Sequence, residues 1–296
     1  MKNNLKATPI LLLTAMIWGF AFVAQRVGAS FLGAFSFNGV RFALGAVSLI
    51  PVILIFDRTK TDKAGRRQLL IASAVGGTVL FLASVLQQWG IEFTGSAGKS
   101  GFMTGLYMVL VPVIGFLFLR RKTNVFVWIG VLCALAGLYL LTIGGSVEKP
   151  GLGDIALITG AVFWALHILV VDSYTAKGIS VLKFAGGQFV VCAILNLICA
   201  LCFEDLTWAG VQGAAVPILY GGIMSVGVAY TLQIIGQKHS EPAYASIVLS
   251  LESMFSAIGG AIILKERMTA GGYVGCVLMF AGIMLAQADD LRKKKR

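Results

Sequence analysis

Charged residues are scarce in this chain of 296 residues. Asp, Glu, Lys and Arg together make up 12% of it, against about 25% in soluble globular proteins. Hydrophobic residues make up 58%, and the mean hydropathy is +0.88. The shortage of charge excludes an ordinary water-soluble domain of this length and predicts a polytopic membrane protein.

The chain also lacks the motifs of a catalytic or metal site. It has two histidines, and no HExxH, P-loop, GxSxG or dinucleotide-binding pattern. Its five cysteines all fall inside apolar runs, where packing roles are the rule. We therefore expect no enzyme activity, no cofactor and no bound metal. The net charge of +11 comes from short loops and the C-terminus, without aromatic-basic patches, so we expect no nucleic-acid partner.

Apolar runs of about 20 residues, the length that spans the bilayer as a helix, recur along the chain. They are longer than the strands of an outer-membrane barrel and are apolar on all sides. The prediction is an all-α protein with ten transmembrane helices, at Thr8–Gln25, Leu32–Phe56, Arg67–Trp89, Ala97–Leu119, Asn124–Ile143, Leu152–Val171, Val181–Cys202, Gly213–Ile235, Pro242–Leu264 and Gly271–Ala288.

The distribution of basic residues predicts the orientation. With a cytoplasmic N-terminus, 18 of the 24 Lys and Arg residues lie inside and five outside, while Arg41 falls within a span. Basic residues favour the cytoplasmic side. We therefore expect a multi-pass protein of the cytoplasmic membrane with both termini inside.

The second half of the sequence repeats the first about 146 residues later. Phe37–Phe42 recurs as Phe184–Phe189, and the Gln87-x-Trp89-Gly90 pattern as Gln233-x-Ile235-Gly236. Five spans per repeat is an odd number, so the two halves, residues 1–145 and 146–296, must enter the membrane from opposite sides. Inverted repeats of this kind are a common plan for transporters.

Polar residues inside spans are costly in lipid and mark candidate sites. Glu252 shares a helical face with Tyr244 and Ser256, which favours lining a wet cavity, although an ion pair with Arg41 explains it too. Arg41 itself is either an anion ligand or a structural partner, and Gln188 is its neutral repeat counterpart. His167 either couples protons or is a neutral hydrogen-bonding group. The predicted cavity residues are Trp18, Gln87, Thr104, Tyr107, Trp164, His167, Gln233, Glu252 and Ser256.

Several of these stretches, in order, resemble EamA-type transporters of the drug/metabolite transporter superfamily. The stretches are Gln87–Ala97, Gly101–Tyr107 and Val111-Pro112 in the first half, and Ser250–Ser253, Lys265–Thr269 and Gly275–Gly282 in the second. One departure is Arg120-Arg121-Lys122, where the family usually has an acidic residue, which Glu266 keeps in the second half.

The resemblance implies a secondary carrier with a central cavity that exports a small metabolite, such as an amino acid, an amine or a drug-like solute. A flippase for a lipid or lipid-linked solute is the alternative. A coupling proton or counter-substrate, and a homodimer through the fifth and tenth helices, are further partners to test.

Overall fold

All regular structure described for this chain is helical. The computed structural model describes residues 4–57, 62–120, 123–142, 151–267, 269–286 and 288. The first half contains α1 (Asn4–Gly28), α2 (Ala34–Phe56), α3 (Lys63–Thr94), α4 (Ala97–Gly105), α5 (Tyr107–Leu119) and α6 (Val125–Thr142). The second contains α7 (Leu152–Thr175), α8 (Val181–Phe203), α9 (Trp208–Gly213), α10 (Ala215–Leu219), the π-helix η1 (Tyr220–Tyr230), α11 (Thr231–His239), α12 (Pro242–Leu249), α13 (Glu252–Ile263) and α14 (Ala270–Ala286).

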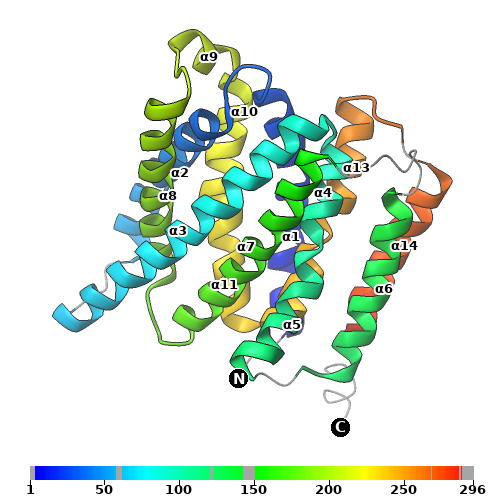
Figure 1. The fold of residues 1–296 in the computed structure, drawn as a ribbon. Helices are drawn as coiled ribbons and strands as arrows, with labels where there is room; N and C mark the ends of the chain where they lie inside the picture. Colours follow the sequence, from blue (N-terminus) through cyan, green and yellow to red (C-terminus); the bar gives the residue numbers. More distant parts are fainter. Residues whose placement is uncertain are drawn as a thin grey trace.

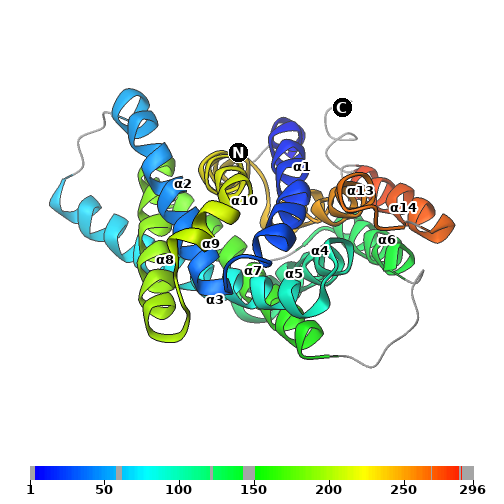
Figure 2. The ribbon, with the colours of Figure 1, turned by 90° about the horizontal axis from the view of Figure 1, so that it is seen from above.

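Among these residues, eight helical segments are long and apolar enough to cross a membrane, and α6 and α14 are shorter apolar helices. The expected all-α polytopic membrane fold is confirmed. Helix α1 runs through the middle of the bundle, with α2, α3 and α8 on one side and the α6–α14 pair at the opposite edge (Figures 1 and 2).

Corresponding helices of the two halves pack head to tail. Asp57, at the end of α2, bonds to Ser180 at the start of α8, while Glu204, at the end of α8, bonds to the first amides of α2. The last helix of each half also packs against its counterpart in the opposite direction. Gly130 of α6 faces Gly282 of α14, and Gly137 faces Gly275. Counterparts that run in opposite directions are the structural form of an inverted repeat.

The fourth and ninth predicted spans are long helices, Ala97–Leu119 and Pro242–Ile263, whose hydrogen-bond pattern changes at one point. The first changes at Leu106, between α4 and α5, and the second at Ser250-Leu251, between α12 and α13. Short i→i+3 hydrogen bonds close both turns, for example Val109 N to Leu106 O at 3.0 Å. Each change lies near the middle of its span, just before Tyr107 or Glu252, and the backbone stays right-handed helical across it. The sequence signal for these changes is weak, since only Pro112 lies near either one.

The eighth predicted span also changes its hydrogen-bond pattern within one continuous helix, Ala215–His239. It is divided into α10, the π-helix η1 and α11, whereas its repeat counterpart, about residues 74–84, lies within the unbroken α3. Pro217 precedes η1, and Gly221, Gly222 and Gly227 lie in it. Proline removes a backbone donor, and π-helical segments are frequent at functional sites. The two halves therefore match in order and direction but not in detail.

The α6–α14 contact depends on glycine. A Cβ added at Gly130 would lie 2.6 Å from the Gly282 carbonyl oxygen, and one at Gly137 would lie 2.5 Å from that of Gly275. Small residues let membrane helices approach closely where no hydrophobic effect drives them together. These glycines explain why two short helices without buried polar side chains stay paired.

We expect Gly130→Ala to weaken this pairing and lower the thermal stability of the protein in detergent. The added methyl group meets backbone, which cannot turn aside, and overpacking of this kind costs about 1–3 kcal/mol. Gly271→Ala is the matched control, because its Cβ would lie 3.4 Å from the nearest atom, the Leu140 carbonyl oxygen. Equal melting temperatures for the two variants would contradict the glycine-dependent contact.

Candidate functional site

A cavity lies between the two halves of the bundle. The space open to water inside it is about 20 Å³, about what one water molecule needs. Helices α1, α2, α3 and α5 from the first half and α7, η1, α11 and α13 from the second contribute to its wall. The lining residues are Trp18, Ala21, Phe22, Gln25, Arg41, Gln87, Tyr107, Trp164, Ile168, Ser225, Tyr230, Gln233 and Glu252.

Three aromatic rings form one wall of the cavity. The ring centroids of Trp18 and Tyr230 are 4.6 Å apart, and those of Trp164 and Tyr230 are 6.1 Å apart with nearly parallel planes. The Trp18 indole is fixed by a 3.3 Å hydrogen bond from Nε1 to the Ser225 carbonyl oxygen in η1. Trp18 and Trp164 are repeat counterparts, so the pseudo-symmetry of the fold brings them together. Their π faces offer a surface for an apolar group or a cation.

Five polar groups on the cavity wall have no hydrogen-bond partner among the described parts of the protein. They are Nη2 of Arg41, Oη of Tyr107, Nε1 of Trp164, and Oε1 of both Gln25 and Gln233. All five side chains are buried. Buried polar groups are nearly always satisfied by protein, water or ligand. Donors and acceptors that face one cavity therefore indicate a site for a polar solute or water.

Glu252 is the acidic group of the cavity. It is the first residue of α13, directly after the turn at Ser250-Leu251. The phenol of Tyr107, at the start of α5, interacts with this carboxyl group, although the contact does not have hydrogen-bond geometry and the hydroxyl keeps a free donor. The two changes of hydrogen-bond pattern thus lie beside a carboxylate and a phenol that meet at the cavity.

Arg41 is the basic group of the cavity. Its Nε donates a 2.8 Å hydrogen bond to Oδ1 of Asn38, whose Nδ2 donates at 3.0 Å to the Ser84 carbonyl oxygen. The guanidinium lies 4.9 Å from the ring centroid of Phe42. Within the described residues Arg41 forms no ion pair, with Glu252 or with any other carboxylate. The structural ion pair of Arg41 with Glu252 is therefore not formed among the described residues.

Six of the nine residues predicted to line the cavity do so: Trp18, Gln87, Tyr107, Trp164, Gln233 and Glu252. The other three lie beside it. Ser256 donates a 2.7 Å bond to the Ala97 carbonyl oxygen, and Thr104 accepts a 3.4 Å bond from Gln87. His167 lies behind Trp164 and Tyr230, edge-on to both rings, with Nε2 3.0 Å from Oε1 of Gln188. These residues support the wall rather than form it.

Sequence reasoning missed several lining residues, including Gln25, Ser225 and Tyr230. Gln25 is the last residue of a predicted span. An amide within a span is a polar signal that could have identified it as a site residue. Ser225 and Tyr230 lie in η1, where the π-helical register turns side chains away from the directions that a 3.6-residue period predicts. No sequence pattern announced that change of register.

Known transporters resemble this chain over nearly its whole length. The model of the EamA-like transporter family matches residues 5–143 and again 151–287. An uncharacterized transporter of Archaeoglobus fulgidus is 27% identical, over 93% of this chain and 83% of its own length. The uncharacterized transporter YoaV of Bacillus subtilis is 26% identical, over 94% and 96%.

Two further matches broaden the comparison. The threonine/homoserine exporter RhtA of Escherichia coli is 28% identical, over 91% of this chain and 89% of its own. One solved crystal structure superposes with a TM-score of 0.78 at 17% identity, over 97% of this chain and 98% of the other. At that identity the structural match supports the fold alone.

Proposed function

The chain belongs to the EamA-like transporter family, and from this premise we propose that it exports a small zwitterionic solute, such as an amino acid, by alternating access. One observation carries the proposal. The same cavity holds a cation, Arg41, that has no ion-pair partner in the described chain, and a carboxylate, Glu252. Arg41 and Glu252 both line the cavity, and neither charge is neutralised by the other.

Each charged group of such a solute has a complementary partner. The free Nη2 of Arg41 and Nε1 of Trp164 are donors for a carboxylate. The carboxylate of Glu252 and the free amide oxygens of Gln25 and Gln233 are acceptors for an ammonium group. The side chain of the solute would lie against the aromatic wall. RhtA is named as an exporter of threonine and homoserine, which are zwitterions of this kind.

Glu252 also offers a route to energy coupling. A buried carboxylate needs a compensating positive charge, and either the ammonium group of the solute or a proton supplies it. Exchange of one for the other would couple solute efflux to proton entry. The relatives named above are described as transporters or exporters, so we do not propose the flippase.

Counterflow in reconstituted vesicles tests the proposal. We expect unlabelled threonine or homoserine inside the vesicle to accelerate entry of the labelled amino acid. The corresponding amines and carboxylic acids, which carry one charge, should be exchanged at least about tenfold more slowly, since loss of one charge-assisted bond costs about 1.5–3 kcal/mol. Flux without trans-acceleration would indicate a channel. Faster exchange of single-charge solutes would contradict the zwitterion.

His167 offers a separate test of proton coupling. Because it lies behind the aromatic wall and bonds to Gln188, we expect His167→Asn to raise the KM several-fold through a less ordered wall. The shape of the pH–rate profile should stay unchanged. The measurement is counterflow from pH 5.5 to 8.5. A flattened profile in the variant, with KM unchanged, would return His167 to the coupling role.

A further inference from the structure

Carboxylates at the ends of the bundle connect its two halves. The end expected to face outside carries the N-termini of α2, α4 and α7, and we refer to it as the outer end. There Glu204 accepts hydrogen bonds from the amides of Phe35 and Ser36 at 2.9 and 2.8 Å, at the start of α2. Each such contact joins a side chain of the second half to a helix N-terminus of the first. Carboxylates are favourable at helix N-termini, where free amides and the helix dipole attract them.

Glu266 makes the equivalent contact with α4. Its carboxylate accepts from the amides of Ala97 and Gly98 at 3.1 and 3.3 Å and from Oγ of Ser96 at 3.1 Å. Glu266 follows directly after α13, the helix that Glu252 opens. Glu266 therefore connects the outer end of α13, whose first residue lines the cavity, to the outer end of α4.

The repeat predicts a partner for each of these contacts at the inner end. Asp57 is the counterpart of Glu204, 147 positions earlier, and it makes the expected contact with Ser180 and, at 3.5 Å, with Nζ of Lys183. The counterpart of Glu266, 145 positions earlier, is Arg121, which lies outside the described residues. The counterpart of Ser96 is Glu241, which precedes α12. Three of these four equivalent positions therefore carry a carboxylate. At the fourth, the sequence has an arginine in place of the carboxylate and a glutamate in place of the serine.

The hydrogen bonds along the half-helices show the same asymmetry. Between α4 and α13, Oγ of Ser253 donates to the Gly101 carbonyl oxygen at 2.5 Å, and Oγ of Ser256 to that of Ala97 at 2.7 Å. Between α5 and α12, within the described chain, a single bond of 3.5 Å joins Ser246 to the Met108 carbonyl oxygen, which Pro112 leaves without its helical donor.

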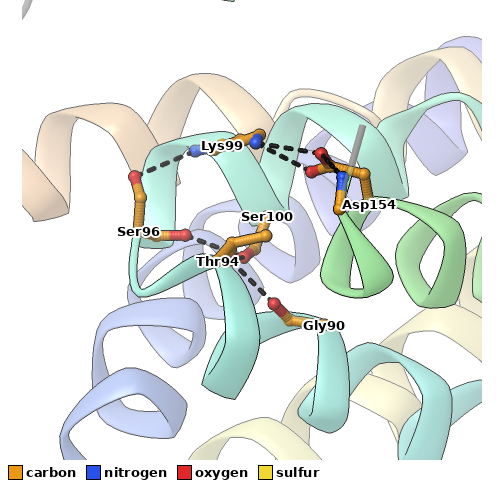
Figure 3. Close-up of polar contacts among 7 residues, drawn as sticks. Gly90, Thr94, Ser96, Lys99, Ser100 and Asp154 are labelled. Atoms are coloured by element: carbon orange, nitrogen blue, oxygen red, sulfur yellow. Dashed lines mark hydrogen bonds and ion pairs between the residues drawn. The ribbon is translucent and has the colours of Figure 1, made fainter. Parts of the chain in front are cut away.

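Helix α4 also forms polar contacts with α3 and α7. Nζ of Lys99 lies 2.8 Å from Oδ1 of Asp154 at the start of α7, and Oγ1 of Thr94 lies 2.9 Å from Oγ of Ser100 (Figure 3). If the outer end opens, α4 therefore remains with α3 and α7, and α13 is the helix that parts from it. The bonds that must break are those of Glu266 and of the two serines.

From these contacts we propose that the α4–α13 contact is the outer gate of the transporter and that Glu266 is its latch. The α2–α8 pair, with a carboxylate at both ends, is the static frame. The α5–α12 contact, at the opposite end of the same helices, is the inner gate. The proposal rests on the alternating access proposed above. It adds which helices part and which residue holds them.

Accessibility of a cavity cysteine tests the latch without any solute. Ala21, on the cavity wall, is replaced by cysteine after the five native cysteines are removed. A membrane-impermeant maleimide is then applied from one side of sealed vesicles. A cysteine at the exposed Arg267, next to Glu266, identifies the outer side. We expect Glu266→Gln to raise the labelling rate from this side at least about tenfold, because the amide cannot replace a charge-assisted carboxylate contact.

Two further variants separate the latch from a general loss of structure. In Gly260→Ala the new Cβ would lie 2.8 Å from Oε2 of Glu266, so the carboxylate must move while its charge is kept. This variant should also raise the rate. Glu241→Gln removes an exposed carboxylate at the inner end and should leave the rate unchanged. Unchanged labelling in both Glu266→Gln and Gly260→Ala, or an equal rise in Glu241→Gln, overturns the latch.

The result is independent of the proposed solute. Faster labelling in a protein that shows no amino-acid counterflow would support the gate and reject the zwitterion. Counterflow together with unchanged labelling would reject the gate alone.

Discussion

Replacing Glu252 with glutamine is expected to reduce amino-acid counterflow about 10- to 100-fold while the protein still inserts and folds. The carboxylate is the acidic group of the cavity wall, and charge-assisted hydrogen bonds contribute about 1.5–3 kcal/mol. Glutamine has nearly the same shape, so the packing at the start of α13 should survive. The measurement is the initial rate of counterflow, normalised to the amount of folded protein in the vesicles.

Glu92→Gln is the matched control for this variant. Glu92 lies in α3, is partly buried and does not line the cavity. Its neutralisation should leave counterflow within about twofold of the unmodified protein. Full activity of Glu252→Gln, or an equal loss in Glu92→Gln, would remove Glu252 from the binding site.

The second large effect is expected from Arg41→Gln, which installs the residue found at the repeat counterpart, Gln188. We expect the exchange of zwitterions to fall about 10- to 100-fold. Exchange of amines without a carboxylate should be unchanged or faster, because the variant removes a buried positive charge that repels them. The measurement is counterflow of an amino acid and of its decarboxylated amine in the same vesicles.

Arg41→Lys tests whether Arg41 orients the solute or only supplies a positive charge. Lysine keeps the charge but cannot donate to Asn38 and to the cavity together, since it lacks the planar fork of the guanidinium. We expect a partial loss for the amino acid. Equal losses of amino acid and amine in Arg41→Gln would point instead to a structural role. Arg26→Lys, at an exposed bond to the Gly95 carbonyl oxygen, controls for arginine replacement as such.

Much of the site could be predicted from sequence because lipid makes polar residues conspicuous. Glu252, Gln87 and Gln233 stand out in apolar runs, and polar groups in spans are costly unless they face a cavity or a partner. Trp18 and Trp164 stood out for another reason, as counterparts in a repeat. Whether a polar residue faces the cavity or a partner within the protein was harder to predict. Ser256 shares a helical face with Glu252, yet its hydroxyl is satisfied by the Ala97 carbonyl oxygen.

Helical periodicity assigns a direction around one helix axis but not the neighbour that lies there. His167 and Trp164 are a turn apart on α7, but only Trp164 reaches the cavity, while Gln188 of α8 occupies the position beside the histidine. Tyr230 was missed for a related reason, because it ends a π-helix and its direction follows a different period.

The sequence by itself determined the class of this protein, the approximate number and limits of its hydrophobic segments, and the duplication that sets them in opposite directions. Hydrophobicity and repeated order suffice for these, because they are properties of one segment or of two segments compared. Only the tertiary structure decided where three spans change their hydrogen-bond pattern, that Arg41 and Glu252 share a cavity without pairing, and that Glu266 caps a helix 168 to 170 residues away. Those features depend on contacts between distant segments, which no local pattern encodes.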